Sequence, residues 1–377
     1  MTGARRATAA FFFLLGAAVA VWASLVPFVK ATLGLDEARL SLFLLTFGVG
    51  SIVSSLGAPW VARRTGHRAV LVVGGAGMAA SLPLLAVTSA PWLLGALLLG
   101  FGLFAGLTEV GANAQAIVVQ SRMGRSQMSL LHGLYSVGGL VGAALGALAL
   151  GAGMSTTHWT LLASVALLVL VATQARHLAS DGFGADGASE ARPGRPPVGV
   201  LLVGLMTMVL YLSEGAVLDW SAVFLHDHRG YDLATAGLGY AAFSVTMATG
   251  RLLGDRVVDR LGASRVVGAG TLLAASGFAL LVLAPWQAAS LGGCALIGLG
   301  ASNVVPTLIS QSARVPGVDA ARAVATVSAM GTGGLLAGPA LIGFAAQATS
   351  LQVALGGLAV LLLAVSAGAR SLRTSAR

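Results

Sequence analysis

Apolar stretches of about 20 residues recur along this chain, and short polar or glycine-containing breaks separate them. A helix of roughly 20 apolar residues is long enough to cross the hydrocarbon core of a bilayer. The sequence therefore predicts an all-α membrane protein. It has about twelve membrane-spanning helices, at residues 8–29, 37–61, 69–88, 91–119, 128–153, 156–175, 198–225, 233–257, 265–285, 288–311, 322–348 and 350–369.

Similar segments recur in the two halves of the chain. Gly66 and Gly262 lie in similar basic turns 196 positions apart, and a Gly-Gly-Leu sequence recurs at 138–140 and 333–335, 195 positions apart. The nearly equal offsets predict a duplicated unit, arranged as two pseudo-symmetric six-helix bundles. The bundles are residues 1–175 and 198–377, and residues 176–197, rich in Gly, Pro and Asp, form a polar linker.

The distribution of charge predicts how the chain crosses the membrane. Hydrophobic residues make up 56% of the chain and charged residues 9%, with a net charge of +9. If the N-terminus is cytoplasmic and the spans alternate, nineteen of the 22 basic residues lie on the cytoplasmic side. Lys30, Arg39 and Arg229 remain outside. The pattern indicates a multi-pass protein of a bacterial cytoplasmic (inner) membrane, with both termini and the linker in the cytoplasm.

Several function classes are disfavoured by the residues present. The arginines occupy short loops between spans, so the basic charge is assigned to membrane topology rather than to nucleic acid. No catalytic constellation is recognisable, which argues against an enzyme. Cys294 is the only cysteine, and His226 and His228 lack further ligands at suitable spacing, so neither a metal site nor a cofactor is predicted.

Three acidic residues lie inside predicted spans, namely Glu109, Glu214 and Asp219. A carboxylate at membrane depth is costly unless it is paired or protonated, and it is a functional hypothesis by default. Glu109 and Glu214 lie near span centres and are candidates for proton coupling, with Glu109 the main one. A protonated Glu109 that only donates a hydrogen bond to another helix is the alternative. Asp219 and Trp220 are assigned to the outer interface or to a structural role.

Other polar and aromatic residues in the spans are candidates for binding a solute. The candidate substrate-binding residues are Trp22, Asn113, His132, Tyr135, Glu214 and Asn303. Asn113 lies one turn after Glu109 on the same helix face. The alternatives are packing for Trp22 and His132, and interhelical hydrogen bonding for Asn303.

A turn between the eighth and ninth spans carries a resemblance to a known family. The segment GRLLGDRVVDRLGASR at Gly250–Arg265 resembles the turn that marks the major facilitator superfamily, and GSIVSSLGAPWVARRTGHR at Gly50–Arg68 keeps its basic residues without an acid. Arg251, Asp255 and Arg256 are expected at the cytoplasmic end of the eighth span. The resemblance implies gating by Asp255, Arg256, Asp259 and Arg260.

Within that superfamily the chain resembles the bacterial fucose-permease-like branch and its uncharacterised inner-membrane relatives. The likeness rests on WASLVPFVKATLGL at Trp22–Leu35, TEVGANAQA at Thr108–Ala116, HGLYSVGGLVGA at His132–Ala143 and EGAVLDWSAVFL at Glu214–Leu225. In proton-coupled members an acid in the fourth span, followed four residues later by asparagine, is functional, and Glu109 and Asn113 match that pattern. Sugar-transporting members also carry an acid in the first span, whereas residues 8–29 contain none.

The resemblance implies a secondary active transporter that moves a small organic solute across the cytoplasmic membrane by alternating access, coupled to protons and acting as a monomer. Its partners are the solute, protons and the lipid bilayer. A transporter-like membrane sensor without flux is the alternative. Export of an amphiphilic metabolite or drug and import of a sugar-like solute both fit the sequence.

Overall fold

Helices account for nearly all of the chain in the computed structural model, which describes residues 2–35, 37–179, 196–231, 238–370 and 372. The predicted linker falls mostly outside the described residues, at 180–195. The chain folds into two compact units, residues 1–127 with 131–190 and residues 128–130 with 191–377. The division of the chain into 1–175, 176–197 and 198–377 stays a prediction.

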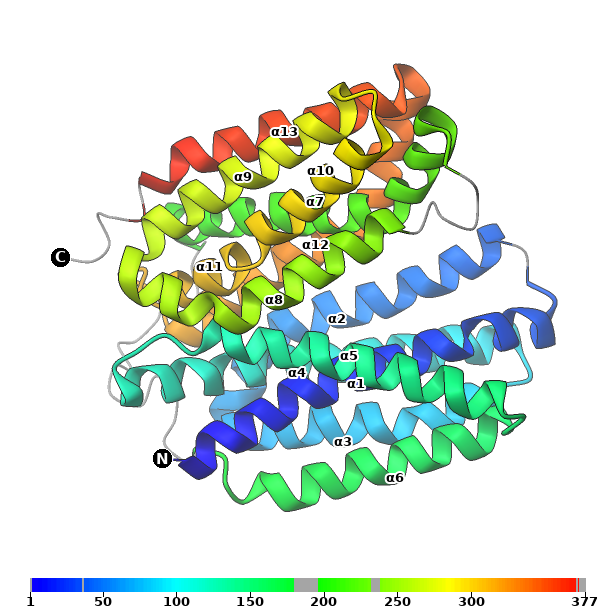
Figure 1. Cartoon of the computed structure of the whole chain (residues 1–377). Helices are drawn as coiled ribbons and strands as arrows, with labels where there is room; N and C mark the ends of the chain where they lie inside the picture. Colours follow the sequence, from blue (N-terminus) through cyan, green and yellow to red (C-terminus); the bar gives the residue numbers. More distant parts are fainter. Residues whose placement is uncertain (1, 36, 180–195, 232–237, 371, 373–377) are drawn as a thin grey trace. The chain divides into compact units, whose positions relative to one another are not determined.

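Each unit contains helices that match the predicted spans (Figure 1). The first six helices are α1 (Thr2–Leu33), α2 (Glu37–Thr65), α3 (His67–Ala86), α4 (Pro91–Met123), α5 (Met128–Gly151) and α6 (Thr156–Ala175). The remaining helices are α7 (Val198–Arg229), α8 (Leu238–Leu261), α9 (Ala263–Leu283), α10 (Gln287–Ala301), α11 (Val304–Ser312), α12 (Ala320–Ala348) and α13 (Leu351–Gly368). The all-α membrane fold predicted from the pattern is confirmed.

Turn chemistry in the sequence explains where several helices begin and end. Pro91 occupies the first turn of α4, and Gly124 ends that helix with φ of 62°. Asp319 caps α12 by accepting a hydrogen bond from the backbone N–H of Arg322 at 3.0 Å. The repeated glycines Gly66 and Gly262 join α2 to α3 and α8 to α9 with φ of 84° and 80°, a conformation that residues with a side chain rarely adopt.

The two units share a packing scheme, as expected for a duplicated sequence. In the first unit α2 packs on α4, α4 on α3, and α3 on α6; in the second, α8 packs on α10, α10 on α9, and α9 on α13. Close approach of backbones is visible between α9 and α10, where a Cβ added at Gly277 would lie 2.7 Å from the carbonyl oxygen of Gly293. Small residues permit such close packing between membrane helices.

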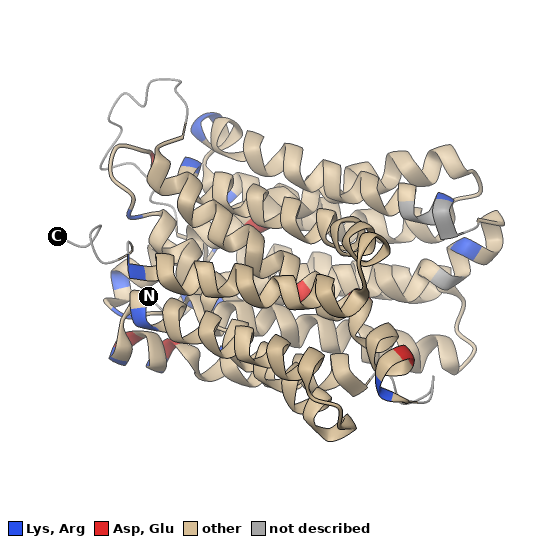
Figure 2. Ribbon diagram, turned by 90° about the horizontal axis from the view of Figure 1, so that it is seen from above, with Lys and Arg blue, Asp and Glu red and all other residues tan. Residues whose placement is uncertain are grey.

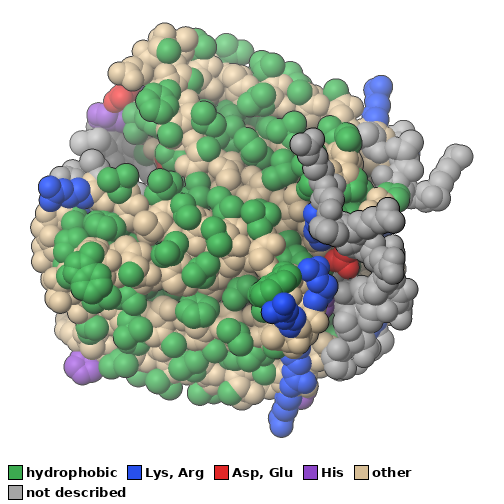
Figure 3. Space-filling model, turned by 180° about the vertical axis from the view of Figure 1, so that it is seen from behind, with side chains coloured by type: hydrophobic (Ala, Val, Ile, Leu, Met, Phe, Trp, Pro, Cys, Tyr) green, Lys and Arg blue, Asp and Glu red, His purple; other side chains and the backbone are tan. Residues whose placement is uncertain are grey.

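Within the described residues, eleven helical segments are long and apolar enough to cross a membrane. The segment Gln287–Ser312, formed by α10 and α11 together, counts as one of them. α8 is the predicted span that does not reach this criterion, because Arg251, Asp255, Arg256, Asp259 and Arg260 fall in its second half. Large apolar side chains such as Leu42, Trp92 and Leu140 remain exposed, and Figure 3 shows hydrophobic side chains spread over much of one face of the molecule. Figure 2 shows that Lys and Arg gather near the helix ends.

The tenth span differs from the predicted single helix over 288–311, because it is broken at Ser302 and Asn303. Pro306 lies in the first turn of α11 and has no backbone N–H, so the carbonyl oxygen of Ser302 lacks its ordinary helical donor. Non-helical backbone at membrane depth is tolerated where protein groups satisfy it. The carbonyl oxygen of Ser302 can therefore accept a hydrogen bond from a nearby side chain.

Candidate functional site

Glu109 lies near the middle of α4, where the sequence predicts a proton-coupling group. The residue is half-buried, and among the described residues its side chain has no hydrogen bond or ion pair. Asn113, one turn later on the same helix, is fully buried. The Nδ2 of Asn113 is buried without a hydrogen-bond partner. This part of α4 therefore keeps one carboxyl group and one amide donor available for hydrogen bonding.

His132 lies against Asn113 within the same unit. Its Nε2 is 3.2 Å from Oδ1 of Asn113, and because the amide oxygen accepts, Nε2 carries a proton and donates this hydrogen bond. The His132 ring also contacts the Phe12 ring, with centroids 5.0 Å apart. The hydrogen bond and the ring contact fix the imidazole between α1 and α4. The structure thus brings two of the predicted substrate-binding residues together, one turn from Glu109.

Trp22 and Tyr135 are the other candidates in this unit. Trp22 is buried in α1. The backbone of Tyr135 lies against Gly16, where an added Cβ would collide with the Tyr135 carbonyl oxygen. This close contact brings α5 against α1. It is a packing role for the backbone of α5, whereas the substrate-binding role of both side chains stays a prediction.

Glu214, the second predicted proton-coupling residue, forms an ion pair within the second unit. Nη2 of Arg251 on α8 lies 3.4 Å from Oε1 and 3.5 Å from Oε2 of Glu214 on α7. The exposed fractions of the two side chains are 8% for Arg251 and 16% for Glu214. The two side chains therefore carry opposite charges next to each other. Glu214 and Glu109 therefore differ in their electrostatic surroundings.

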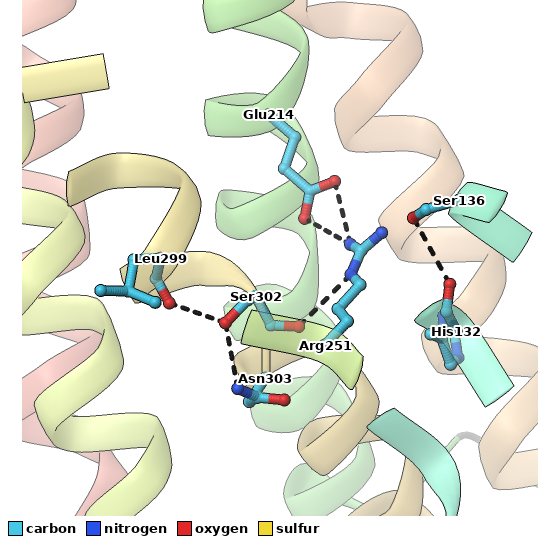
Figure 4. Close-up of polar contacts among 7 residues, drawn as sticks. All are labelled: His132, Ser136, Glu214, Arg251, Leu299, Ser302 and Asn303. Atoms are coloured by element: carbon cyan, nitrogen blue, oxygen red, sulfur yellow. Dashed lines mark hydrogen bonds and ion pairs between the residues drawn. The ribbon is translucent and has the colours of Figure 1, made fainter. Parts of the chain in front are cut away.

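Arg251 also connects this ion pair to the helix break between α10 and α11. Its Nε donates a hydrogen bond of 3.3 Å to the carbonyl oxygen of Ser302, the group that Pro306 leaves without a helical donor. Figure 4 shows the Arg251 guanidinium between the Glu214 carboxylate and this carbonyl. The sequence predicts Arg251 at the cytoplasmic end of its span, but the residue is buried near the middle of α8. The sequence feature that could have indicated this buried position is the placement of Arg251 inside an apolar stretch, one turn before Asp255.

Asn303 lies beside this site and makes the interhelical hydrogen bonds considered as one alternative. Its Nδ2 donates to the carbonyl oxygen of Gly250 at 3.1 Å and to Oγ of Ser302 at 3.0 Å. Its side chain covers Gly254, where an added Cβ would collide with the amide. The Oδ1 of Asn303 is buried without a hydrogen-bond partner. Asn303 therefore holds α8 against the break and keeps one acceptor unused.

Asp219 and Trp220 are on α7 beyond Glu214. Asp219 is exposed, and among the described residues its carboxylate has no hydrogen bond or ion pair. The Trp220 ring lies close to Gly343 of α12, and its Nε1 is buried without a partner. The assignment of both residues to the outer interface or to a structural role stays a prediction.

The predicted gating residues occupy the last turns of α8. Residues 128–130, the start of α5, belong to the second unit, and there Asp255 accepts hydrogen bonds from the backbone N–H groups of Ser129 at 3.0 Å and Leu130 at 3.1 Å. A carboxylate at a helix N-terminus is favoured by the free N–H groups and by the helix dipole. Arg256, Asp259 and Arg260 are exposed. Asp255 thus caps α5, a role that spacing along the chain does not reveal.

Comparison with known proteins identifies the family. An uncharacterised MFS-type transporter of Yersinia pestis is 40% identical over 369 residues, which cover 96% of this chain and 93% of that protein. The chain belongs to the Major Facilitator Superfamily. The model of that superfamily matches residues 203–375. The membrane protein MosC of Rhizobium meliloti is 29% identical over 352 residues, covering 91% of this chain and 84% of that protein.

Solved structures of superfamily members share the fold. The outward conformation of FucP, which is the Escherichia coli fucose:proton symporter, matches with a TM-score of 0.80 and 17% identity, over 99% of this chain and 98% of that one. The human organic anion transporter MFSD10 matches with a TM-score of 0.72 and 20% identity, over 98% and 99% of the two chains. The superfamily resemblance drawn from the sequence is confirmed. This superfamily protein is a multi-pass membrane transporter.

Among the residues that the structure describes, no group of three His, Cys, Asp or Glu side chains is arranged to hold a metal ion. The described residues of this superfamily member do bring together carboxylates, amides, an imidazole and the buried guanidinium of Arg251. Such groups bind solutes and exchange protons with water.

Proposed function

We propose that this protein is a secondary active transporter of a small organic solute, coupled to protons and working by alternating access. It acts as a monomer in the bacterial cytoplasmic membrane, with both termini in the cytoplasm. Membrane transport follows from the family. The coupling and the orientation rest on the carboxyl groups and on the distribution of arginine.

The observation that carries proton coupling is Glu109, a carboxyl group near the centre of α4 without a partner among the described residues. A carboxylate at membrane depth without a partner is costly, so Glu109 is suited to bind a proton there and to release it when water reaches it. Asn113 lies one turn from Glu109, His132 is hydrogen-bonded to Asn113, and both supply hydrogen-bonding groups for a solute. A solute bound at Asn113 and His132 therefore changes the surroundings of Glu109, and this couples solute binding to protonation of Glu109.

Glu214 is the second candidate for proton coupling. Its carboxylate is already paired with the guanidinium of Arg251, whereas Glu109 has no partner among the described residues. In FucP, a fucose:proton symporter with the same fold, solute movement is tied to protons. The present proposal gives Glu109 that role.

The test is proton-driven transport in proteoliposomes, using a solute first identified by thermal-shift screening of metabolites and antibiotics. Glu109→Gln keeps the shape of the side chain and removes the titrating group. The variant is expected to lose uphill transport driven by a pH gradient while it keeps counterflow exchange. Asp219→Asn, which alters an exposed acid of α7, is the matched control and retains uphill transport.

Uphill transport that survives in Glu109→Gln but not in Glu214→Gln would move the coupling role to Glu214. If it survives in the double variant, the carboxylate proposal is wrong. Lack of any flux by the wild-type protein, with solute binding intact, would instead favour the membrane-sensor alternative.

A further inference from the structure

Among the residues that the structure describes, Arg251 is the one lysine or arginine that is buried. Its guanidinium is held near the middle of α8, next to α7 and to the break between α10 and α11 (Figure 4). A charged group at this depth is retained in membrane proteins mainly for function. The role of Arg251 is not explained by proton coupling through Glu109.

The contact between Arg251 and Glu214 is loose for a buried ion pair. A single nitrogen, Nη2, approaches both carboxylate oxygens, at 3.4 and 3.5 Å. Charge-assisted hydrogen bonds are ordinarily about 2.7–2.9 Å long, and arginine and carboxylate groups often meet through two parallel bonds. Nε is meanwhile occupied by the carbonyl oxygen of Ser302. Glu214 therefore neutralises the charge of Arg251 without the two parallel hydrogen bonds that bind a guanidinium most tightly to a carboxylate.

Few other charges lie on the helices that surround this pair. The helices packed on α7 are α8, α10, α11, α12 and α13. Of these, α10, α11 and α13 carry no Asp, Glu, His, Lys or Arg, and α12 carries only Arg322 in its first turn. The other charges of α8 are Asp255, Arg256, Asp259 and Arg260, which follow Arg251 toward the end of that helix. On α7 itself, Asp219 and the charged residues 226–229 lie toward its C-terminal end.

We propose that Arg251 binds a carboxylate of the transported solute, and that Glu214 occupies its place when the solute is absent. The inference rests on the transport function proposed above and names a solute class for it, small organic anions. When the solute carboxylate pairs with Arg251, a proton from water binds to Glu214. The site then holds one positive and one negative charge before and after binding, and no unpaired charge is left at membrane depth.

The carbonyl oxygen of Ser302 keeps Arg251 in position through this exchange. Because Pro306 cannot supply an N–H group, the carbonyl remains an acceptor for Nε whether Glu214 or a solute occupies Nη2. Asn303 supports the same turn through its bonds to Gly250 and to Oγ of Ser302. The broken helix thus serves as a fixed anchor for the guanidinium.

The test uses chemical rescue in the purified full-length protein. Glu214→Ala removes the Cγ methylene and the carboxylate of the side chain, which together have the size of acetate. Sodium acetate is expected to raise the Tm of this variant in a saturable way. Its half-saturating concentration should be at least about tenfold lower than that of acetamide, a difference of about 1.4 kcal/mol. Sodium chloride at equal concentration controls for ionic strength.

Two variants provide the controls. Arg251→Gln combined with Glu214→Ala should lose the acetate effect, because the guanidinium is gone. Asp219→Ala removes an exposed acid of the same helix and should show no acetate effect beyond that of the wild type. If Glu214→Ala does not fold, Glu214→Gln takes its place in the same measurement.

The wild-type protein tests the link to protons. Acetate should stabilise it more at pH 6 than at pH 8, and Glu109→Gln should retain that difference because Glu109 belongs to the other unit. The proposal is overturned if acetate and acetamide act alike on the Glu214 variants. It is also overturned if acetate rescues Glu214→Ala but leaves the wild type unaffected at both pH values. Neither result bears on proton coupling by Glu109, which the transport assay measures separately.

Discussion

Arg251 on α8 and Glu214 on α7, 37 positions apart in the sequence, form an ion pair at 3.4 Å with both side chains largely buried. Removing one partner of a buried pair leaves an uncompensated charge. Arg251→Gln or Glu214→Gln alone is therefore expected to destabilise the protein by about 3–5 kcal/mol. The double variant should be markedly more stable than the sum of the single effects predicts.

The measurement is a double-mutant cycle of unfolding free energies, in detergent and at neutral pH. Glu109→Gln is the matched control, because Glu109 has no partner among the described residues and its replacement breaks no ion pair. Additive effects of Arg251→Gln and Glu214→Gln would contradict the pairing.

Pro306→Ala is expected to change transport more than stability. Alanine supplies the N–H group that proline lacks, so the Ser302 carbonyl gains a helical donor that competes with Nε of Arg251. The tenth span should become a more continuous helix, and solute affinity should fall because Arg251 loses its anchor. Solute binding by thermal shift and unfolding stability measure the two effects. Unchanged affinity would show that the break does not position Arg251.

Asp255→Asn is expected to alter the transport rate more than solute affinity. The Asp255 carboxylate accepts the N–H groups of Ser129 and Leu130 at the start of α5, away from the mid-span acids. A neutral amide weakens this cap, and interactions of this kind bias a conformational equilibrium without touching the solute. Arg256→Ala, on the same turn of α8, is expected to act in the same direction.

Transport rate, equilibrium binding and spin-label distances separate the possibilities. A loss of equilibrium binding in Asp255→Asn with an unchanged distribution of conformations would contradict the gating role. Asp259→Asn, an exposed acid one turn further along, shows the effect of removing charge from the same helix.

Reporter fusions test the predicted orientation. Nineteen of the 22 basic residues fall on one side of the membrane when the twelve spans alternate from a cytoplasmic N-terminus. A reporter fused after residue 377, or inserted within 181–192, is expected to report a cytoplasmic location. A reporter inserted between α5 and α6 at residue 153 should report the opposite side. Periplasmic activity at residue 377 would mean that a span was missed or added.

The sequence by itself determined the all-α membrane fold, the repeated turns at Gly66 and Gly262, and the family. These are local properties, because about 20 apolar residues span a bilayer whatever lies beside them, and a positive φ favours glycine at that one position. Counting residues along each predicted span also indicated that Glu109, Glu214 and Asn113 lie near span centres. This counting did not identify the partners of these residues.

The tertiary structure decided which polar groups meet. The Nε2 of His132 reaches Asn113, Arg251 pairs with Glu214 rather than lying at the helix end, and Pro306 frees a carbonyl to which Arg251 donates. These contacts depend on the rotation of each helix about its axis and on which helices are neighbours. These spans are apolar on most of their faces, so the few polar positions do not determine how each helix is rotated or which helices are its neighbours. Both are decided by the packing of the helices.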